Sequence, residues 1–263
     1  MTKISDIDFS KIPPKVILYG PPGCGKTGLL LTLGSRLQVL DTDNGLRTAF
    51  GMQDKWRPQR LAVDAVQFLE EEPEKRALAF RQIKEYIYGL PKKIKLGDFP
   101  YEFIGIDSFT TFAKSAISFV MGNSGKLGQA PEIQHWGLAF IEVNNVLSVL
   151  RALPIGVILC VHEMINTVNK EEKVTLAIPG KNLPGEVASY FDEVWYMRKR
   201  AIGQNKFRHI IQTTSDEAIM ARSRSEVPNE TDISCGLLEI FTKLGYKPKE
   251  TKNALAPPTV EML

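Results

Sequence analysis

A glycine-rich octapeptide near the start of the chain has the residue types and spacing of a phosphate-binding loop. The segment reads Gly20-Pro21-Pro22-Gly23-Cys24-Gly25-Lys26-Thr27, which fits the pattern G-x-x-x-x-G-K-[ST]. Glycines let backbone N–H groups approach a phosphate, the lysine ammonium reaches the β- and γ-oxygens, and the threonine hydroxyl is a ligand for Mg²⁺. We therefore expect this loop and the following Gly28 to bind ATP, with Lys26 as a catalytic cation and Thr27 as a metal ligand.

The flanks of the loop fit the same interpretation. Residues 16–19 form an apolar, β-branched run typical of a buried strand, and the apolar residues that begin at Gly28 predict a helix. The alternative is a Gly/Pro turn that happens to match the pattern. The strand and the helix around the motif favour the phosphate loop, because together they are the setting that the chemistry requires.

Carboxyl groups end two other apolar runs. Asp107 closes the run at residues 103–107, and an Asp in such a place beside a phosphate loop holds Mg²⁺, usually through water. Asp41 and Asp43 end another run, and residues two apart in an extended chain point the same way. We predict that Asp107 is a metal ligand and that Asp43 orients the attacking water. The alternative interpretation of Asp41 and Asp43 is a turn that merely closes the strand.

The elements that must position these residues alternate along the chain. Strand-like runs occur at residues 38–41, 103–107, 155–161, 193–197 and 207–213, and helical patterns at residues 70–89, 109–121 and 133–153. Residues 168–174 indicate the tip of a hairpin. This alternation predicts an α/β fold with a mainly parallel sheet covered by helices.

Composition places the chain among ordinary globular proteins. Its 263 residues are 43% hydrophobic and 24% charged, with a net charge of +3 and three widely spaced cysteines. We expect no membrane segment and a cytoplasmic location, in a bacterial host if the chain is phage-encoded. The expected organisation is an N-terminal arm (residues 1–14), an ATPase core (residues 15–243) and a disordered tail (residues 244–263).

With these motifs the chain resembles the RecA-type ATPases, and more narrowly the phage RecA-core single-strand annealing recombinases of the Sak group, over residues 14–226. In that class the metal-binding Asp is commonly followed by Ser, as in Asp107-Ser108, and the water-activating acid lies in a D-x-E arrangement, for which this chain has Asp41-Thr42-Asp43. The resemblance implies a RecA-like P-loop core with helices on both faces of its sheet. It further implies ATP and Mg²⁺ as cofactors and action on single-stranded DNA in annealing or recombination.

The same resemblance suggests further site residues and partners. His162, at the end of the run at residues 155–161, is similar to a γ-phosphate sensor, and Arg222 and Arg224 resemble fingers that reach a neighbour's nucleotide. Residues 122–135 and 164–181 occupy the places of two DNA-binding loops, whose candidate contacts are Lys126, Lys170, Lys173 and Lys181. The implied assembly is a homo-oligomer, either a filament or a ring, with a single-strand-binding protein as a further candidate partner.

Other classes share parts of this pattern. An AAA+ ATPase would show an acidic pair at the end of the metal strand and an arginine in a helical lid, and a small-molecule kinase would need an arginine-rich lid. Here Asp107 is followed by Ser108, and no lid of adequate length follows the last strand. A nucleotide-gated DNA-binding module with little turnover stays open, because Asp43 is one methylene shorter than Glu. For His162, the two arginines and the loop lysines, ordinary structural or solvated roles are the alternatives.

Overall fold

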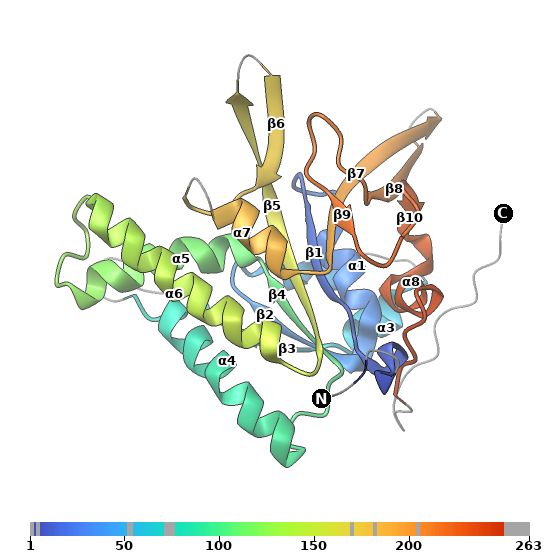
Figure 1. The fold of residues 1–263 in the computed structure, drawn as a ribbon, viewed down its shortest axis with the longest axis horizontal. Coiled ribbons are helices and arrows are strands. Elements are labelled where there is room, and N and C mark those ends of the chain that lie inside the picture. The colour runs from blue at the N-terminus through green and yellow to red at the C-terminus, as the bar shows by residue number, and fades with distance from the viewer. Residues whose placement is uncertain are drawn as a thin grey trace.

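A mixed sheet with helices on both faces forms the centre of the molecule (Figure 1). The computed structural model describes residue 3 and residues 6–51, 55–70, 77–168, 171–180, 183–203 and 206–249. Within these residues the strand order is β10-β8-β7-β1-β5-β4-β2-β3, with β6 paired to β5 and β9 to β7.

The strands have the following bounds: β1 Lys15–Gly20, β2 Leu37–Asp41, β3 Asp64–Gln67, β4 Phe103–Asp107, β5 Gly156–Val168, β6 Glu171–Leu176, β7 Glu193–Gly203, β8 Lys206–Gln212, β9 Arg222–Ser223 and β10 Thr231–Asp232. The helices are α1 Lys26–Leu30, α2 Thr48–Gly51, α3 Arg57–Leu61, α4 Ala79–Leu96, α5 Phe109–Asn123, α6 Ile133–Ala152, α7 Leu183–Tyr190 and α8 Leu237–Lys243. The 3-10 helices include η2 Phe9–Lys11, η3 Leu31–Arg36 and η5 Ile233–Cys235.

The inner part of the sheet is parallel. The strands β7, β1, β5, β4, β2 and β3 all pair in parallel, whereas β6, β8, β9 and β10 join by antiparallel pairing. Val16 to Tyr19 in β1 are fully buried, as expected of a parallel strand with both faces covered. The predicted fold class, an α/β fold with a mainly parallel sheet and helices on both faces, is confirmed.

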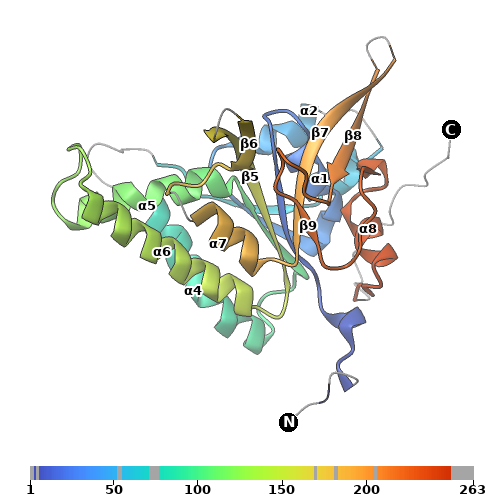
Figure 2. The same ribbon diagram turned by 45° about the horizontal axis from the view of Figure 1, so that its top comes forward.

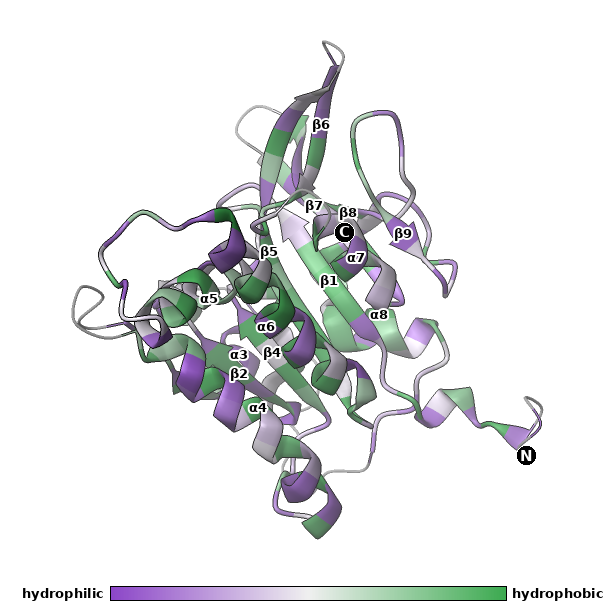
Figure 3. Ribbon diagram, turned by 60° about the vertical axis from the view of Figure 1, so that its left-hand side comes forward, coloured by the Kyte–Doolittle hydropathy of each residue, from purple (hydrophilic) through white to green (hydrophobic). Residues whose placement is uncertain are grey.

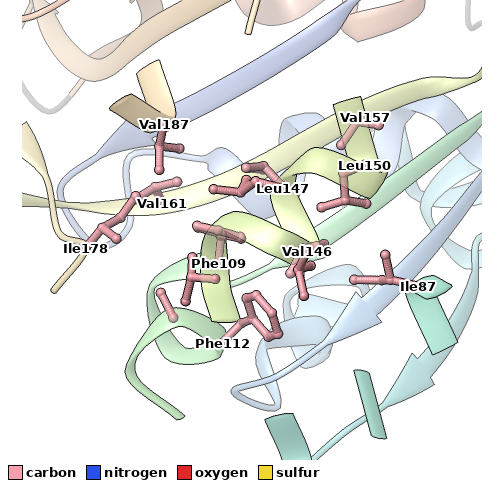
Figure 4. Close-up of a cluster of buried hydrophobic side chains, with 14 of the residues drawn as sticks. Ile87, Phe109, Phe112, Val146, Leu147, Leu150, Val157, Val161, Ile178 and Val187 are labelled. Atoms are coloured by element: carbon pink, nitrogen blue, oxygen red, sulfur yellow. The ribbon is translucent and has the colours of Figure 1, made fainter. Parts of the chain in front are cut away.

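Two apolar layers hold the helices on the sheet. Figure 2 shows α4 to α7 on one face and α1 with α8 on the other, and the inner strands are the apolar ribbons of Figure 3. Phe109, Phe112, Val146 and Leu147 from α5 and α6 belong to one buried cluster with Val161 of β5 (Figure 4). Each large side chain buried in this way contributes roughly 1.5–3 kcal/mol to folding.

On the second face, a smaller cluster centres on α1 and α8. Leu29, Leu30, Trp195 and Phe241 are buried together there. Helix α1 is short, since the chain tightens into η3 after Leu30. The single helix expected after the phosphate loop is therefore divided in two.

Several boundaries differ from those expected. Helix α4 begins at Ala79 rather than at residue 70, and residues 71–76 lie outside the described chain. Strand β5 continues past residue 161 to Val168, because its outer half pairs with β6 in a hairpin. Strand β3 was not anticipated, since its short and largely exposed sequence carries little apolar signal.

The two terminal segments meet at the amino edge of the sheet. The amide of Lys247 donates to the carbonyl oxygen of Ser10 at 2.8 Å, and the buried Tyr246 donates its hydroxyl to Glu102 at 2.5 Å. Residues 244–249, the first part of the tail predicted to be disordered, are thus packed against the core, whereas residues 250–263 lie outside the described chain. Among the described helices, none is long and apolar enough to cross a membrane.

Candidate functional site

The glycine-rich loop joins β1 to α1 at the carboxyl edge of the sheet. Gly20 has a φ of 151° and Gly25 a φ of 104°. A Cβ at Gly20 would lie 2.3 Å from the carbonyl oxygen of Met197, and one at Gly25 would lie 3.1 Å from Nδ1 of His209. Both positions therefore require glycine, for the conformation and for the close approach of β7 and β8.

Lys26 lies folded across the loop. Its side chain is buried, and Nζ donates to the carbonyl oxygens of Gly20 at 2.8 Å and Pro21 at 3.0 Å. The ammonium is thus held at the mouth of the loop by neutral acceptors. A phosphate would replace these acceptors with a stronger, charge-assisted hydrogen bond.

Thr27 and Asp107 meet beside the loop. Asp107 is 4% exposed, its Oδ2 has no hydrogen-bond partner among the described residues, and the nearby Thr27 side chain acts to lower the pKa of its carboxyl group. Burial raises the pKa of Asp107 to about 6, and the charges of Asp43 and Asp41 act in the same direction. A buried carboxylate with an unused oxygen beside a hydroxyl fits Mg²⁺, which takes one or two protein oxygens and completes its shell with water and phosphate.

The two aspartates at the end of β2 have different roles. Asp41 is fully buried and accepts from the amide of Gly45 at 3.2 Å and from Nε2 of Gln67 at 3.1 Å, so it closes the turn. Asp43 points to the site, and its Oδ2 lies 3.8 Å from Nε2 of His162. The His162 contact, more than any other, holds the pKa of Asp43 below its ordinary value. The turn interpretation therefore applies to Asp41 and leaves Asp43 available.

His162 reaches the site because β5 lies between β1 and β4. Its register partner on β1 is Gly20, the first residue of the loop. Its backbone N–H donates to Oγ1 of Thr110 at 2.9 Å, and its ring Nδ1 is buried without a partner. The structure thus brings Lys26, Thr27, Asp43, Asp107 and His162 to one edge of the sheet.

The two arginines proposed as fingers bind within their own chain. The guanidinium of Arg222 donates to the carbonyl oxygens of Ala188, at 2.8 Å, and of Phe191, and so caps the end of α7. Arg224 forms an ion pair with Asp192 at 3.0 Å. These carbonyl groups give Arg222 a structural role within its own chain, and its role as a finger stays a prediction. Arg224 stays a prediction.

The predicted DNA-binding lysines do not form a basic patch in the described residues. Lys126 forms an ion pair with Glu132 at 2.7 Å. Lys173 is exposed on β6, where it directly follows the acidic residues Glu171 and Glu172. Lys170 and Lys181 lie outside the described residues. The hairpin itself projects beyond the carboxyl edge of the sheet (Figure 1).

Two residues on the β7–β8 hairpin belong to the surroundings of the loop but were not singled out from the sequence. Nδ1 of His209 lies 2.7 Å from the carbonyl oxygen of Cys24. Lys199 is the register partner of His209 on β7. The signal that could have found them is the cluster of basic residues at 198–200 and 206–209, in two neighbouring segments with strand character.

Fold and site together define a P-loop nucleotide-binding protein of the ATPase type. The chain belongs to the AAA_24 family, described as an AAA domain, which matches residues 12–225. No curated protein sequence matches it significantly.

Two solved structures resemble the fold. The flagellar accessory protein FlaH from Methanocaldococcus jannaschii is 12% identical with a TM-score of 0.44, over 80% of this chain and 84% of that chain. An ATPase from the type III secretion system of pathogenic bacteria is 16% identical with a TM-score of 0.45, over 71% of this chain and 52% of that chain.

Proposed function

We propose that this protein hydrolyses ATP with Mg²⁺ at the carboxyl edge of its sheet. The observation that carries the proposal is the convergence of Lys26, Thr27, Asp107, Asp43 and His162 on one loop. Phosphoryl transfer depends mainly on positioning and on charge stabilisation. This edge supplies a cation, a metal-binding pair and an ionised carboxylate for those tasks.

Each residue has a separate task in this proposal. Thr27 and Asp107 would hold Mg²⁺, which when bound neutralises charge on the phosphates. Lys26 leaves the carbonyl oxygens of Gly20 and Pro21 to bind the outer phosphates. Asp43 orients the attacking water, and its lowered pKa keeps it ionised for this purpose. His162 contacts Asp43 and reports whether the terminal phosphate is present.

Single-stranded DNA is the proposed effector, bound by an oligomer in annealing or recombination. The support is the continuity of β5, which runs without a break from His162 into the projecting β5–β6 hairpin. A ligand on that hairpin is therefore connected to the nucleotide site through a single strand. The contacts proposed on this side of the molecule are Lys126, Lys170, Lys173 and Lys181.

A nucleotide-gated binding module is the second candidate, favoured by the short reach of Asp43. An AAA+ machine that uses an arginine from a helical lid is less well supported. Asp107 is followed by Ser108 rather than by a second acidic residue, whereas an AAA+ protein would show an acidic pair at the end of the metal-binding strand.

The test is phosphate release from ATP at several protein concentrations, with and without single-stranded DNA, and with Lys26→Ala as the blank. Stimulation by DNA, with activity per subunit rising with concentration, is the expected result. ATP binding without phosphate release would favour the module. Turnover that depends on neither DNA nor concentration would exclude the DNA-dependent oligomer.

A further inference from the structure

The β7–β8 hairpin presents two different faces beside the phosphate loop. Residues directly opposite each other in an antiparallel pair lie on the same face, and successive residues alternate. Lys199 pairs with His209, and Arg200 pairs with Arg208. Lys199 and His209 therefore share one face, while Arg200 and Arg208 share the other.

The face with Lys199 and His209 is turned to the loop. His209 Nδ1 lies 2.7 Å from the carbonyl oxygen of Cys24, and its ring backs Gly25. A Cβ built on Gly23 would lie 4.0 Å from Nζ of Lys199, with no other described atom so near. The exposed Lys199 ammonium thus lies close to Gly23 in the loop. It is supplied by β7, whereas Lys26 lies at the start of α1.

Charge pairing distinguishes Lys199 from the other cations of the hairpin. Arg198 and Arg200 both form ion pairs with Glu230, at 2.8 Å and 2.6 Å. Arg208 pairs with Asp232 at 2.8 Å. Lys199 forms no ion pair with any residue of the described chain. An uncompensated cation beside a loop that binds anions through its backbone N–H groups is available for the ligand.

We propose that Lys199 is a second phosphate-binding lysine of the nucleotide site, supplied in cis by the β7–β8 hairpin, and that His209 is a positioning residue of the loop. The ligand is the polyphosphate chain of a nucleotide, so the inference rests on nucleotide binding at this loop. It needs neither hydrolysis nor DNA. Two lysines, Lys26 within the loop and Lys199 above it, then hold the phosphates from different elements.

The role of His209 follows from hydrogen-bond chemistry. A carbonyl oxygen only accepts, so Nδ1 carries the proton and donates to Cys24. That bond fixes the peptide group between Cys24 and Gly25, whose single N–H, that of Gly25, belongs to the phosphate-binding loop. An Asn side chain places its amide near the position of Nδ1, whereas a Gln amide extends toward that of Nε2. His209→Asn should therefore preserve the loop, and His209→Gln should not.

The experiment is equilibrium titration of the full chain with MgATP and MgADP, at low and high salt, by calorimetry. Lys199→Ala should weaken ATP binding about tenfold to a hundredfold, the size expected for a charge-assisted hydrogen bond. Lys199→Arg should recover part of the affinity. The loss of affinity in Lys199→Ala should become smaller as the salt concentration rises, because salt screens the attraction between the exposed ammonium and the phosphates. Arg200→Ala, on the other face of the same strand, is the matched control and should bind within twofold of wild type.

The outcomes separate this inference from the site itself. If wild type and Lys26→Ala both fail to bind, the nucleotide site is wrong. If Lys26→Ala loses binding while Lys199→Ala binds as wild type does, the Lys199 assignment alone is overturned. An equal loss in Lys199→Ala and Arg200→Ala, or a loss that does not change with salt, would show a structural effect of the hairpin and also overturn it. Equal affinities of His209→Asn and His209→Gln would reject the positioning role.

Discussion

Asp43 and His162 face each other across the carboxyl edge of the sheet, with Oδ2 3.8 Å from Nε2. Asp43 follows the end of β2 and His162 lies in β5, and these two strands are not neighbours, since β4 lies between them. Asp43 leaves the sheet after the turn that Asp41 closes, and so reaches over β4 to the histidine. The ring holds the pKa of Asp43 below its ordinary value, and an ionised carboxylate at this place can accept a hydrogen bond from a water molecule and orient it.

Asp43→Asn should lower the rate of ATP hydrolysis by about a hundredfold, since it removes the charge that orients water. ATP affinity should change less than threefold, because Asp43 does not belong to the loop that binds phosphate. Asp43→Glu, which restores the longer side chain, should retain or raise turnover. Single-turnover rates and calorimetric affinities measure the two effects. Equal turnover of the Asn variant and wild type would remove Asp43 from the mechanism.

His162→Ala should uncouple the hairpin from the nucleotide. We expect the basal rate to fall, and the ratio of rates with and without single-stranded DNA to fall to about one. His162→Gln keeps a side chain with a donor and an acceptor and should recover part of that ratio. Steady-state assays at saturating DNA measure it. An unchanged ratio in the Ala variant would show that His162 does not couple DNA binding to ATP hydrolysis.

Asp107 should make the metal-free protein less stable at neutral pH. Its pKa is raised to about 6 in the folded state, from 3.8, so the folded protein binds more protons than the unfolded chain between these values. Above pH 6 the buried, ionised carboxylate therefore lowers the free energy of unfolding by about 3 kcal/mol or less. This loss of stability disappears as the pH falls toward 4 and Asp107 binds a proton.

Asp107→Asn removes this ionisation while keeping an acceptor for Thr27. Urea unfolding in the presence of a chelator should show the variant more stable than wild type at pH 7.5, by up to about 3 kcal/mol, with a smaller difference at pH 4.5. The same variant should lose the magnesium dependence of ATP binding. A difference in stability that is constant with pH would contradict the assignment.

Arg222→Ala should destabilise the fold by about 1–3 kcal/mol, because it leaves carbonyl groups at the end of α7 without their charged donor. Arg224→Ala should cost less than about 1 kcal/mol, as an exposed ion pair does. Thermal and urea unfolding measure both. If Arg222→Ala is as stable as wild type, but its ATPase activity per subunit no longer rises with protein concentration, the result would support the role of Arg222 as a finger.

The nucleotide loop and its strands could be predicted because their signals are local. A glycine motif after an apolar run fixes the strand, the loop and the turn into α1, and the strand-terminal Asp107 follows from the same rule. The hairpins depended on long-range pairing. Nothing local in the sequence of β7 indicates that it continues to Gly203 or that Lys199 faces the loop, because only its pairing with β8 determines that face.

Two other contacts could not be predicted from the sequence, because they form between segments that lie far apart along the chain. Arg222 is a long cationic side chain that could contact a neighbouring subunit. In the folded chain it instead contacts α7, which is distant from it in the sequence. The segment after Lys243 is polar and rich in lysine and proline, so composition indicates disorder. Yet Tyr246 finds a buried acceptor in Glu102.

The buried Glu102 has a practical consequence for handling the protein. Its carboxylate receives a hydrogen bond from the Tyr246 hydroxyl, another from the amide of Lys249 at 3.0 Å, and an ion pair from Arg36. A shortened version that stops at residue 243 would strip two of these donors from a carboxylate that is 1% exposed and should express as a less soluble, less heat-resistant protein. Versions trimmed no earlier than residue 249 should avoid this.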